Sequence, residues 1–414
     1  MNRDWQTITR ILHQPFPKKD AHGSLHMPIY ENVAFEFESA EDIELAFQRK
    51  KPAHAYSRIT NPTVEVFEQK IRAVTGAQGV LALSSGMAAI VNVVMAVASA
   101  GDNIITSRHL FGNTYSLFSS TLKSWGLQAR FADLTRPDEI ESLIDEKTRA
   151  VFFETITNPQ LEVADVEALA AVTKRHGILL LADTTLTPPC AFESKAFGVD
   201  IEVLSTTKYI SGGGVCVGGV IVDNGTYDWR RNPKLASEYE KVGPFALMSL
   251  LRRNVYRNLG ACMSPHTAFL QSLGLETLPL RIDVSSENAR RIAAFLRDDP
   301  RVRAVHYPGI EGSPYYSVAK KQFGRRVGGL LTFDLASRQA CFEFINKVAL
   351  IRKSTNLNDN RTLILHPAST IFCEYDDDLK KKMNVRETMI RLSVGIEAVD
   401  DLIDAMTETL TRIH

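Results

Sequence analysis

The stretch RAVFFETITNPQLEVADVEALAAVTKRHGILLLAD, residues 149–183, decides the fold class of this chain. Residues 149–155 are an apolar run typical of a buried strand. Residues 165–177 have the apolar spacing of a helix that ends at a glycine. Residues 178–183 form a second apolar run, which closes on Asp183. A buried strand, a helix and another buried strand in close succession predict two parallel strands covered by the helix.

The same alternation extends outward from this stretch. On its N-terminal side, residues 63–76 have the pattern of an amphipathic helix, and residues 79–85 that of a short apolar strand. On its C-terminal side, DIEVLST (residues 200–206) is a further strand. This spacing predicts an α/β fold with a mostly parallel central sheet and helices on both of its faces.

Three parts of the chain differ in character. Residues 1–60 are polar, basic and irregular apart from an extended piece at 27–37, and such an arm usually packs on another domain or on a neighbouring molecule. Residues 61–262 carry the strand–helix alternation and are expected to form the large domain. Residues 263–414 change in pattern and are expected to form a smaller α+β domain.

Composition excludes several classes of protein. The chain has 414 residues, with 48 Lys and Arg against 48 Asp and Glu, so its formal net charge is zero. This balance argues against nucleic acid or an anionic membrane as the main partner. The 5 cysteines show neither a CxxC pair nor a metal-ligand spacing, so free thiols and no metal are expected. Without a signal-peptide pattern or a membrane-length apolar run, we expect a cytoplasmic protein.

Polar residues that end the strands of such a sheet are site candidates, because ligands bind beyond the carboxyl ends of parallel strands. SSGMAA (residues 84–89) leads into a helix whose first N–H groups can hold a phosphate, although the motif taken alone favours a tight turn that requires Gly for steric reasons. Asp183 either caps the next segment or neutralises a buried cation, such as a pyridinium nitrogen. Asn158 either contacts a ring oxygen or forms a turn before Pro159.

Lys208 ends the next strand, within STTKYISGGG (residues 205–214). A single lysine is most often a solvated surface group. Here it follows a buried strand and three hydroxyl residues that can donate to phosphate, and it lies 25 positions after Asp183, one crossover away. Near a cationic cofactor, lysine loses its proton more easily and becomes a nucleophile. A phosphate cradle, an acid for a ring nitrogen and a lysine for a Schiff base together predict pyridoxal 5'-phosphate.

The motifs that carry this pattern occur in the order and spacing of a known family. The chain resembles the Cys/Met-metabolism family of pyridoxal-phosphate enzymes over nearly its whole length. This family has the aspartate-aminotransferase-like fold, fold type I. The matching motifs are PIYENVAF, AYSRITNPT, SSGMAA, ETITNP, ADTT, STTKYISGG, HPAST and RLSVGIE.

The resemblance implies a role for each matching residue. Lys208 and Asp183 are the implied catalytic residues, the first as the Schiff-base lysine and the second as the partner of the pyridine nitrogen. Arg391 and Asn356 are the implied substrate-binding residues, with Arg391 clamping the α-carboxylate. The implied cofactor-binding residues are Tyr56, Arg58, Ser85, Gly86, Met87, Phe111, Asn158, Asp183, Thr185, Ser205, Thr207 and Lys208.

The resemblance also implies an oligomer. In the family, the residues that correspond to Tyr56 and Arg58 reach the phosphate in the neighbouring subunit. The arm that carries them would then complete a second active site. A homodimer is therefore the smallest expected assembly, and family analogy favours a homotetramer.

The sequence departs from the family pattern at three positions. Phe111 stands where the family usually has Tyr, and a phenyl ring can stack on the cofactor but cannot move a proton. Gly213 replaces a frequent His just after the lysine. Asn356 stands where Ser is common, although an amide can still contact a carboxylate.

Within the family, the resemblance favours the O-acetylhomoserine sulfhydrylases. Residues 218–233 and 359–370 resemble sulfhydrylase segments, and Asn113 stands where the γ-lyases carry Cys. The implied reaction transfers a sulfur nucleophile to O-acetyl-L-homoserine and gives L-homocysteine, or methionine with methanethiol, and acetate. Cystathionine γ-synthesis or methionine γ-lysis is the alternative. The sulfur donor (sulfide, methanethiol or carrier-bound sulfur) and the ester (acetyl or succinyl) stay open.

Two other classes of protein fit the sequence less well. A nicotinamide oxidoreductase would carry a GxGxxG turn after its first strand, and SSGMAA does not match that pattern. A scaffold without activity would tolerate the loss of Lys208 or Asp183, and both are present.

Overall fold

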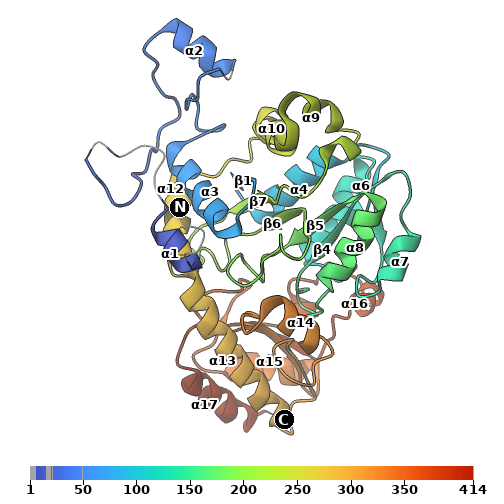
Figure 1. Ribbon diagram of the computed structural model, residues 1–414. Coiled ribbons are helices and arrows are strands. Elements are labelled where there is room, and N and C mark those ends of the chain that lie inside the picture. Colours follow the sequence, from blue (N-terminus) through green and yellow to red (C-terminus); the bar gives the residue numbers. More distant parts are fainter. Residues whose placement is uncertain (1–5, 15–19, 21, 49, 414) are drawn as a thin grey trace.

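Two β-sheets organise the molecule, which we describe from a computed structural model covering residues 6–14, 20, 22–48 and 50–413. The larger sheet has seven strands in the order β1-β7-β6-β5-β4-β2-β3, and the smaller has five in the order β10-β11-β12-β9-β8. In Figure 1 the larger sheet lies in the upper half of the molecule. The smaller sheet lies below it, beside the long helix α13 (Leu278–Asp298).

The larger sheet confirms the predicted mostly parallel arrangement. Its strands are β1 (Gly79–Leu83), β2 (Asn103–Thr106), β3 (Gln128–Phe131), β4 (Thr148–Glu154), β5 (Leu179–Asp183), β6 (Ile201–Leu204) and β7 (Gly219–Asp223). Within this sheet only β7 runs against its neighbours, β1 and β6. The sequence pattern does not single out β7, although all five of its residues are buried. The carboxyl ends of β4, β5 and β6 therefore meet at one edge.

Helices cover both faces of the larger sheet, as Figure 1 shows. They include α3 (Pro62–Thr75), α4 (Gly86–Val97), α7 (Pro137–Ser142) and α8 (Val166–His176), and a π-helical turn (Leu117–Thr121) joins α5 (Gly112–Ser116) to α6 (Leu122–Ser124). The ends of α8 show why these helices form where they do. The Asp165 side chain accepts a hydrogen bond from Ala168 N–H at the start, and Gly177 ends the helix with a left-handed φ of 66°.

The chain between β7 and the smaller sheet is helical. It contains α9 (Ala236–Val242), α10 (Ala246–Leu250), α11 (Tyr256–Leu259) and α12 (Pro265–Glu276), with 3-10 turns at Trp229–Arg231 and Gly243–Phe245 and a π-helical turn at Leu251–Val255. α12 packs against α3, so packing on the larger sheet continues past residue 263. The division into domains at 61–262 and 263–414 stays a proposal. Leu278 and Ile282 of α13 still pack in a cluster with strands of the larger sheet, whereas Ala289 further along the helix belongs to the cluster that includes the smaller sheet.

The smaller sheet and its helices form the C-terminal part. Its strands are β8 (Ala304–His306), β9 (Leu330–Asp334), β10 (Arg352–Lys353), β11 (Leu363–Leu365) and β12 (Met389–Ser393). The helices are α14 (Tyr316–Phe323), α15 (Arg338–Lys347), α16 (Asp377–Lys382) and α17 (Val399–Leu410), and a 3-10 turn spans Pro367–Ser369. β12 is the central strand, and β9 lies between β12 and the edge strand β8, antiparallel to both. This α+β pattern is the predicted one.

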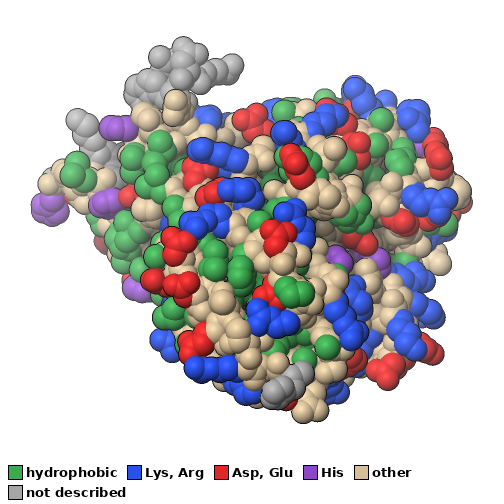
Figure 2. Space-filling model, turned by 90° about the horizontal axis from the view of Figure 1, so that it is seen from below, with side chains coloured by type: hydrophobic (Ala, Val, Ile, Leu, Met, Phe, Trp, Pro, Cys, Tyr) green, Lys and Arg blue, Asp and Glu red, His purple; other side chains and the backbone are tan. Residues whose placement is uncertain are grey.

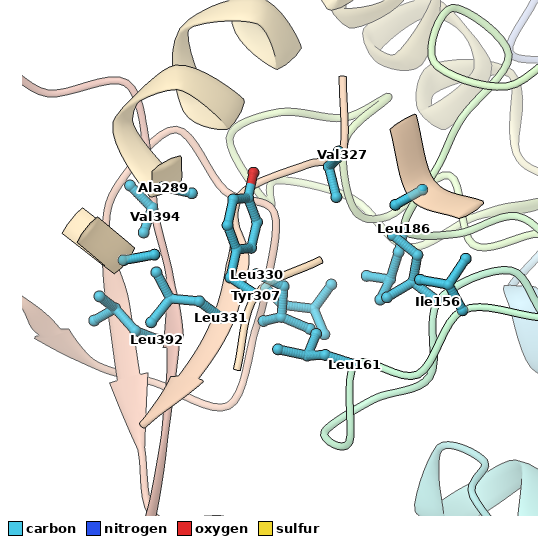
Figure 3. Packing of buried hydrophobic residues seen from close by; sticks show 14 of the residues in the cluster. Ile156, Leu161, Leu186, Ala289, Tyr307, Val327, Leu330, Leu331, Leu392 and Val394 are labelled. Carbon is cyan, nitrogen blue, oxygen red and sulfur yellow. The ribbon is translucent and has the colours of Figure 1, made fainter. Parts of the chain in front are cut away.

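One hydrophobic cluster joins the two sheets. Its members come from strands of the larger sheet, from the loops beyond β4 and β5, from helices and from the smaller sheet. Figure 3 shows Ile156, Leu161, Leu186, Leu330, Leu331 and Leu392 among them. Asn158 lies between the first two of these residues in the chain, and Arg391 precedes the last. The cluster therefore holds the segments that carry Asn158 and Arg391 in a fixed relation, since buried close packing leaves little freedom to move.

The N-terminal arm stands partly apart from this body. Of the expected arm, residues 1–5, 15–19, 21 and 49 lie outside the described residues. α1 (Thr7–Leu12) packs against α3, whereas α2 (Ala40–Phe47) buries none of its residues and projects away from the body in Figure 1. The piece at 27–37 is not a strand and forms one isolated bridge pair, Ala34 with Tyr56.

The surface carries both signs of charge. Figure 2 shows Lys and Arg side chains interspersed with Asp and Glu on the face seen from below, in keeping with the zero net charge. In the part of the chain that the structure describes, none of the helices combines the length and the apolar character needed to span a bilayer.

A buried carboxyl group on β6 makes stability depend on pH. Glu202 is buried and accepts hydrogen bonds from Ser194 and, at 3.0 Å, from Thr184. Burial raises its pKa from 4.5 to about 7. Between these values the unfolded chain releases the proton and the folded chain keeps it. The carboxyl group therefore lowers the free energy of unfolding as pH rises through this window, by about 3 kcal/mol in full.

Glu202→Gln removes this titration and keeps a neutral polar group. The free energy of unfolding of the variant minus that of wild type is expected to be about 2–3 kcal/mol larger at about pH 8 than at about pH 5. Chemical denaturation at a fixed protein concentration measures the difference. Glu193→Gln, at an exposed position, is the matched control and should show no such trend. A difference for Glu202→Gln that does not change with pH would contradict the expectation.

Candidate active site

A cavity of about 460 Å³ lies where the carboxyl ends of β4, β5 and β6 meet the first turn of α4. It is the edge of the sheet at which the sequence places the site. Most of the predicted site residues line it: Ser85, Gly86, Met87, Phe111, Asn158, Asp183, Thr185, Ser205, Thr207, Lys208 and Arg391. Tyr56, Arg58 and Asn356 are not in its lining.

The first turn of α4 is suited to a phosphate. Ser85 caps the helix by accepting a hydrogen bond from Ala88 N–H at 3.0 Å, and the first N–H groups have no partner within the helix. A Cβ at Gly86 would lie 2.7 Å from the Cβ of Ser205, so only glycine lets the helix start approach the end of β6 this closely. The free N–H groups and the helix dipole both favour an anion at this point.

Thr207 and Thr185 order the strand ends beside this turn. The Thr207 hydroxyl donates to the carbonyl oxygen of Gly218 at 3.2 Å and accepts from its N–H at 3.1 Å. The Thr185 hydroxyl accepts a hydrogen bond from Ser205 N–H at 2.9 Å. The hydroxyl of Ser205 has no hydrogen-bond partner among the described residues and is left for a ligand.

Two carboxyl groups, Asp183 and Glu154, lie at neighbouring strand ends in the cavity and are register partners on β5 and β4. Thr185 N–H donates to Asp183 Oδ1 at 2.9 Å, and Phe111 N–H donates to Glu154 Oε1 at 2.6 Å. Burial raises the pKa of both, and the Asp183 charge raises the pKa of Glu154 further. The neutral form is therefore favoured more strongly at Glu154 than at Asp183, and a cationic ring nitrogen would balance a charge on Asp183.

Lys208 also lines this cavity, where its surroundings favour the neutral amine. Its Nζ donates to Asn356 Oδ1 at 2.7 Å. Burial lowers the pKa of Lys208 to about 8, and the charge of Arg391 acts in the same direction. A lysine with this pKa has a sizeable neutral fraction near neutral pH, and the neutral amine is the form that attacks a carbonyl carbon.

Arg391, on β12, is a buried cation with no acidic partner in the described part of the chain. Its Nη1 donates to Asn158 Oδ1 at 3.2 Å, and its Nη2 donates to the carbonyl oxygens of Thr355 and Asn356, each at 3.1 Å. Among the described residues none forms an ion pair with it, and burial lowers its pKa to about 10. Because an unpaired buried charge is costly, an anionic ligand in the cavity would stabilise the site. The carboxylate of an amino acid fits this requirement.

Tyr56 and Arg58 lie outside the cavity of their own chain. The Tyr56 side chain is exposed, and the Arg58 guanidinium lies 5.4 Å from the centre of its ring. Arg58 Nη1 donates to the carbonyl oxygen of Arg257 at 2.7 Å. Their expected contact with the phosphate of a neighbouring subunit stays a prediction.

Two buried acids near the site have no role assigned by a motif. Glu154 ends β4 as Asp183 ends β5, so the rule that polar strand ends are site candidates does point to it. Asp359 lies in the loop between β10 and β11 and contacts Asn356. Asp359 begins the segment 359–370 that resembles the sulfhydrylases, but neither that resemblance nor any periodicity gives this residue a role.

These groups fit pyridoxal phosphate. The α4 turn offers donors for the phosphate, Asp183 offers a carboxylate for the ring nitrogen, Phe111 offers a ring face, and Lys208 offers an amine. The fold and the site together define a pyridoxal-phosphate-dependent enzyme of fold type I.

Comparison with known proteins agrees with this class. The family described as Cys/Met metabolism PLP-dependent enzyme matches residues 8–411. The chain belongs to this family.

Relatives and solved structures support the same assignment. An O-acetyl-L-homoserine sulfhydrylase of Thermus thermophilus is 36% identical, over 97% of this chain and 99% of its own. The structure of an O-acetylhomoserine sulfhydrylase from Wolinella succinogenes is 47% identical, with a TM-score of 0.78 over 86% of this chain and 99% of that one. A Campylobacter jejuni protein described as an O-acetylhomoserine (thiol)-lyase, solved with a pyridoxyl phosphate group on a lysine, is 32% identical. Its TM-score is 0.93, over 98% of this chain and 100% of that one.

Proposed function

We propose that this enzyme transfers a sulfur nucleophile to O-acetyl-L-homoserine and releases acetate. Sulfide would give L-homocysteine, and methanethiol would give methionine. Relatives named O-acetylhomoserine sulfhydrylase or homocysteine synthase support this reaction, because they match nearly the full length of the chain. The cofactor is pyridoxal phosphate, and the substrates are small molecules.

The observation that carries the proposal is that Arg391 and Lys208 both line one cavity. Both groups line it, and the buried guanidinium of Arg391 has no acidic partner among the described residues. An α-amino acid brings a carboxylate for Arg391 and an amine that can take the place of the Lys208 amine. The apolar side chains of Ile90, Leu186 and Leu357 line the rest of the cavity and leave room for the ester side chain.

The residues of the chain then divide the chemistry between them. When bound, pyridoxal phosphate supplies an electron sink for negative charge at the α carbon of the substrate. Lys208, once its amine has been displaced, is placed to remove the α proton and to return a proton later. Its pKa of about 8 lets it hold either form near neutral pH. Asp183 holds a negative charge against the ring nitrogen. Because Phe111 has no ionisable group, proton transfer falls to Lys208.

A panel of substrates tests the reaction. With O-acetyl-L-homoserine and sulfide, the enzyme should form homocysteine and acetate in a 1:1 ratio, measured by mass spectrometry. Cysteine in place of sulfide, and methionine alone, should react at least about tenfold more slowly, a difference of about 1.4 kcal/mol in barrier. O-succinyl-L-homoserine, assayed in the same way, tests whether the enzyme prefers the acetyl ester to the succinyl ester. Faster formation of cystathionine, or of methanethiol from methionine, would replace this proposal with one of those activities.

We also propose that residues 1–60 form an arm that completes the active site of a second copy. Support comes from α2, which buries none of its residues, and from the exposed apolar side chains of Val33 and Phe47, which are 59% and 71% exposed. Exposed apolar side chains on one projecting segment are typical of a surface that a partner covers. The assembly would be a homodimer at least.

Mixing two inactive variants tests the shared site. Arg58→Ala removes the arm's contribution, and Lys208→Ala removes the lysine. If one subunit completes the other, co-refolded mixtures should regain up to about a quarter of wild-type activity, because some dimers then hold one intact site. Each variant refolded alone is the control. A mixture no more active than its components argues against the shared site.

A further inference from the structure

Lys208 is connected to a buried acid outside the cofactor cavity through a single amide. Lys208 Nζ donates to Asn356 Oδ1 at 2.7 Å, and Asn356 Nδ2 donates to Asp359 Oδ2 at 3.2 Å. The side chain of Asp359 is 4% exposed, whereas that of Arg361, its ion-pair partner, is 61% exposed. Asn356 and Asp359 line a second hollow of about 530 Å³, which shares Thr207 with the cofactor cavity.

Asp359 determines which end of the Asn356 amide faces Lys208. A carboxylate only accepts hydrogen bonds, so it holds the NH₂ end of the amide and leaves the oxygen toward the lysine. Without the carboxylate, the amide is free to turn and present its donors to an ammonium that has only donors. Asp359 is itself held in place, because the backbone N–H and the Nε of Arg361 donate to its Oδ1 at 3.1 Å and 2.9 Å.

We propose that Asp359 is a positioning residue that acts through Asn356 to hold the Lys208 amine in one place while it is not bonded to the cofactor. The inference rests on the proposed role of Lys208 and does not depend on which ester or sulfur donor the enzyme uses. The held amine would be aligned to take the α proton, and alignment of a reacting group has a large effect on rate.

The charged groups around Lys208 come from several elements. Arg391, on β12, lowers the pKa of Lys208, and Asp359, in the loop before β11, raises it. Asp183 and Glu154, at the ends of β5 and β4, line the same cavity. Removal of the Asp359 charge should therefore lower the pKa of Lys208.

The glycine loop after Lys208 is shaped around the Asn356–Asp359 pair. Gly214 has a φ of +63°, and a Cβ there would lie 2.8 Å from both Asn356 Nδ2 and Asp359 Oδ2. Gly213 is outside the left-handed region, and a Cβ there would have Val215 as its one contact within 4 Å among the described residues, at 3.5 Å. A methyl group at 214 thus pushes into the pair, and a methyl group at 213 leaves it intact.

The experiment follows how apoenzyme reacts with pyridoxal phosphate as a function of pH, by visible absorbance, alongside kcat, KM and thermal stability. Asp359→Asn should lower kcat about tenfold with KM within about twofold, and should move the pH midpoint of the lysine reaction downward. Gly214→Ala, which keeps both side chains, should lower kcat in the same way. Gly213→Ala should behave as wild type.

Two results would overturn the inference. The first is a wild-type kcat together with a wild-type pH midpoint in Asp359→Asn. If Asp359→Asn does not fold, the same result in Gly214→Ala counts instead. The other is Gly213→Ala with the same loss as Gly214→Ala, which would show a general effect of the loop. If Lys208→Ala apoenzyme develops the wild-type absorbance, the proposed role of Lys208 fails as well. If instead Lys208 reacts with the cofactor as proposed but Asp359→Asn has no effect, only the role of Asp359 fails.

Discussion

Lys208→Ala is expected to lower kcat for sulfur transfer by about 10³-fold or more and to abolish the visible absorbance that pyridoxal phosphate gives with wild type. The lysine is proposed both to bond the cofactor and to move the α proton, and the proton transfer alone is worth about 10²–10⁴-fold. Its Nζ lies in the cavity, and burial lowers its pKa to about 8, which favours both roles. Steady-state kinetics and an absorbance scan of the reconstituted protein measure the two effects.

An exposed lysine provides the control for this substitution. Lys195→Ala removes the same charge at an exposed position outside the cavity lining and should leave both readings unchanged. Circular dichroism of Lys208→Ala should match wild type, because the lost hydrogen bond to Asn356 is the only one its amine makes within the described residues. If Lys208→Ala keeps more than about a tenth of wild-type kcat, another group moves the proton and the assignment is wrong.

Arg391→Gln is expected to lower kcat/KM for O-acetyl-L-homoserine by about 10²–10³-fold, mainly through KM. The buried guanidinium is proposed to bind the substrate carboxylate, and loss of one member of a buried charge pair costs about 2–5 kcal/mol. Gln can still donate toward the carbonyl oxygens of Thr355 and Asn356, so the fold should hold. Steady-state kinetics measure the loss.

The matched variant Arg391→Lys keeps the charge and loses the planar fork. It should fall between wild type and Arg391→Gln, because lysine binds a carboxylate as a point charge. Cofactor absorbance should persist in both variants, since Arg391 is proposed to act on the substrate. A kcat/KM for Arg391→Gln within about threefold of wild type would place the carboxylate elsewhere.

Much of the fold is predictable from the sequence because local and global signals agree. The strand–helix–strand pattern of residues 149–183 appears in the structure as β4, α8 and β5, in parallel register. The antiparallel direction of β7 is not readable, because its apolar run, Val220 to Val222, is the same pattern that a buried parallel strand would have. The packing of α12 on α3 also depends on contacts between distant parts of the chain, which no local pattern encodes.

The candidate site likewise contains residues that the sequence predicts and residues that only the folded structure reveals. Strand-end residues such as Asp183 and Lys208 are found by position, because the carboxyl ends of parallel strands meet at one edge. Asn356 is found by motif, but its place beside Lys208 and outside the cavity lining depends on how the loop before β11 folds. Asp359 is buried through its contacts with Asn356 and Arg361, and only the folded structure shows that these residues meet.

Reduction of the reconstituted enzyme with borohydride, followed by digestion and mass spectrometry, tests the central claim most directly. Borohydride converts a Schiff base between lysine and pyridoxal phosphate into a stable amine, so the modified residue can be identified. The account predicts one pyridoxyl phosphate group per chain, on the peptide that contains Lys208. A group on another lysine, or no modified peptide in a protein that binds the cofactor, would contradict it.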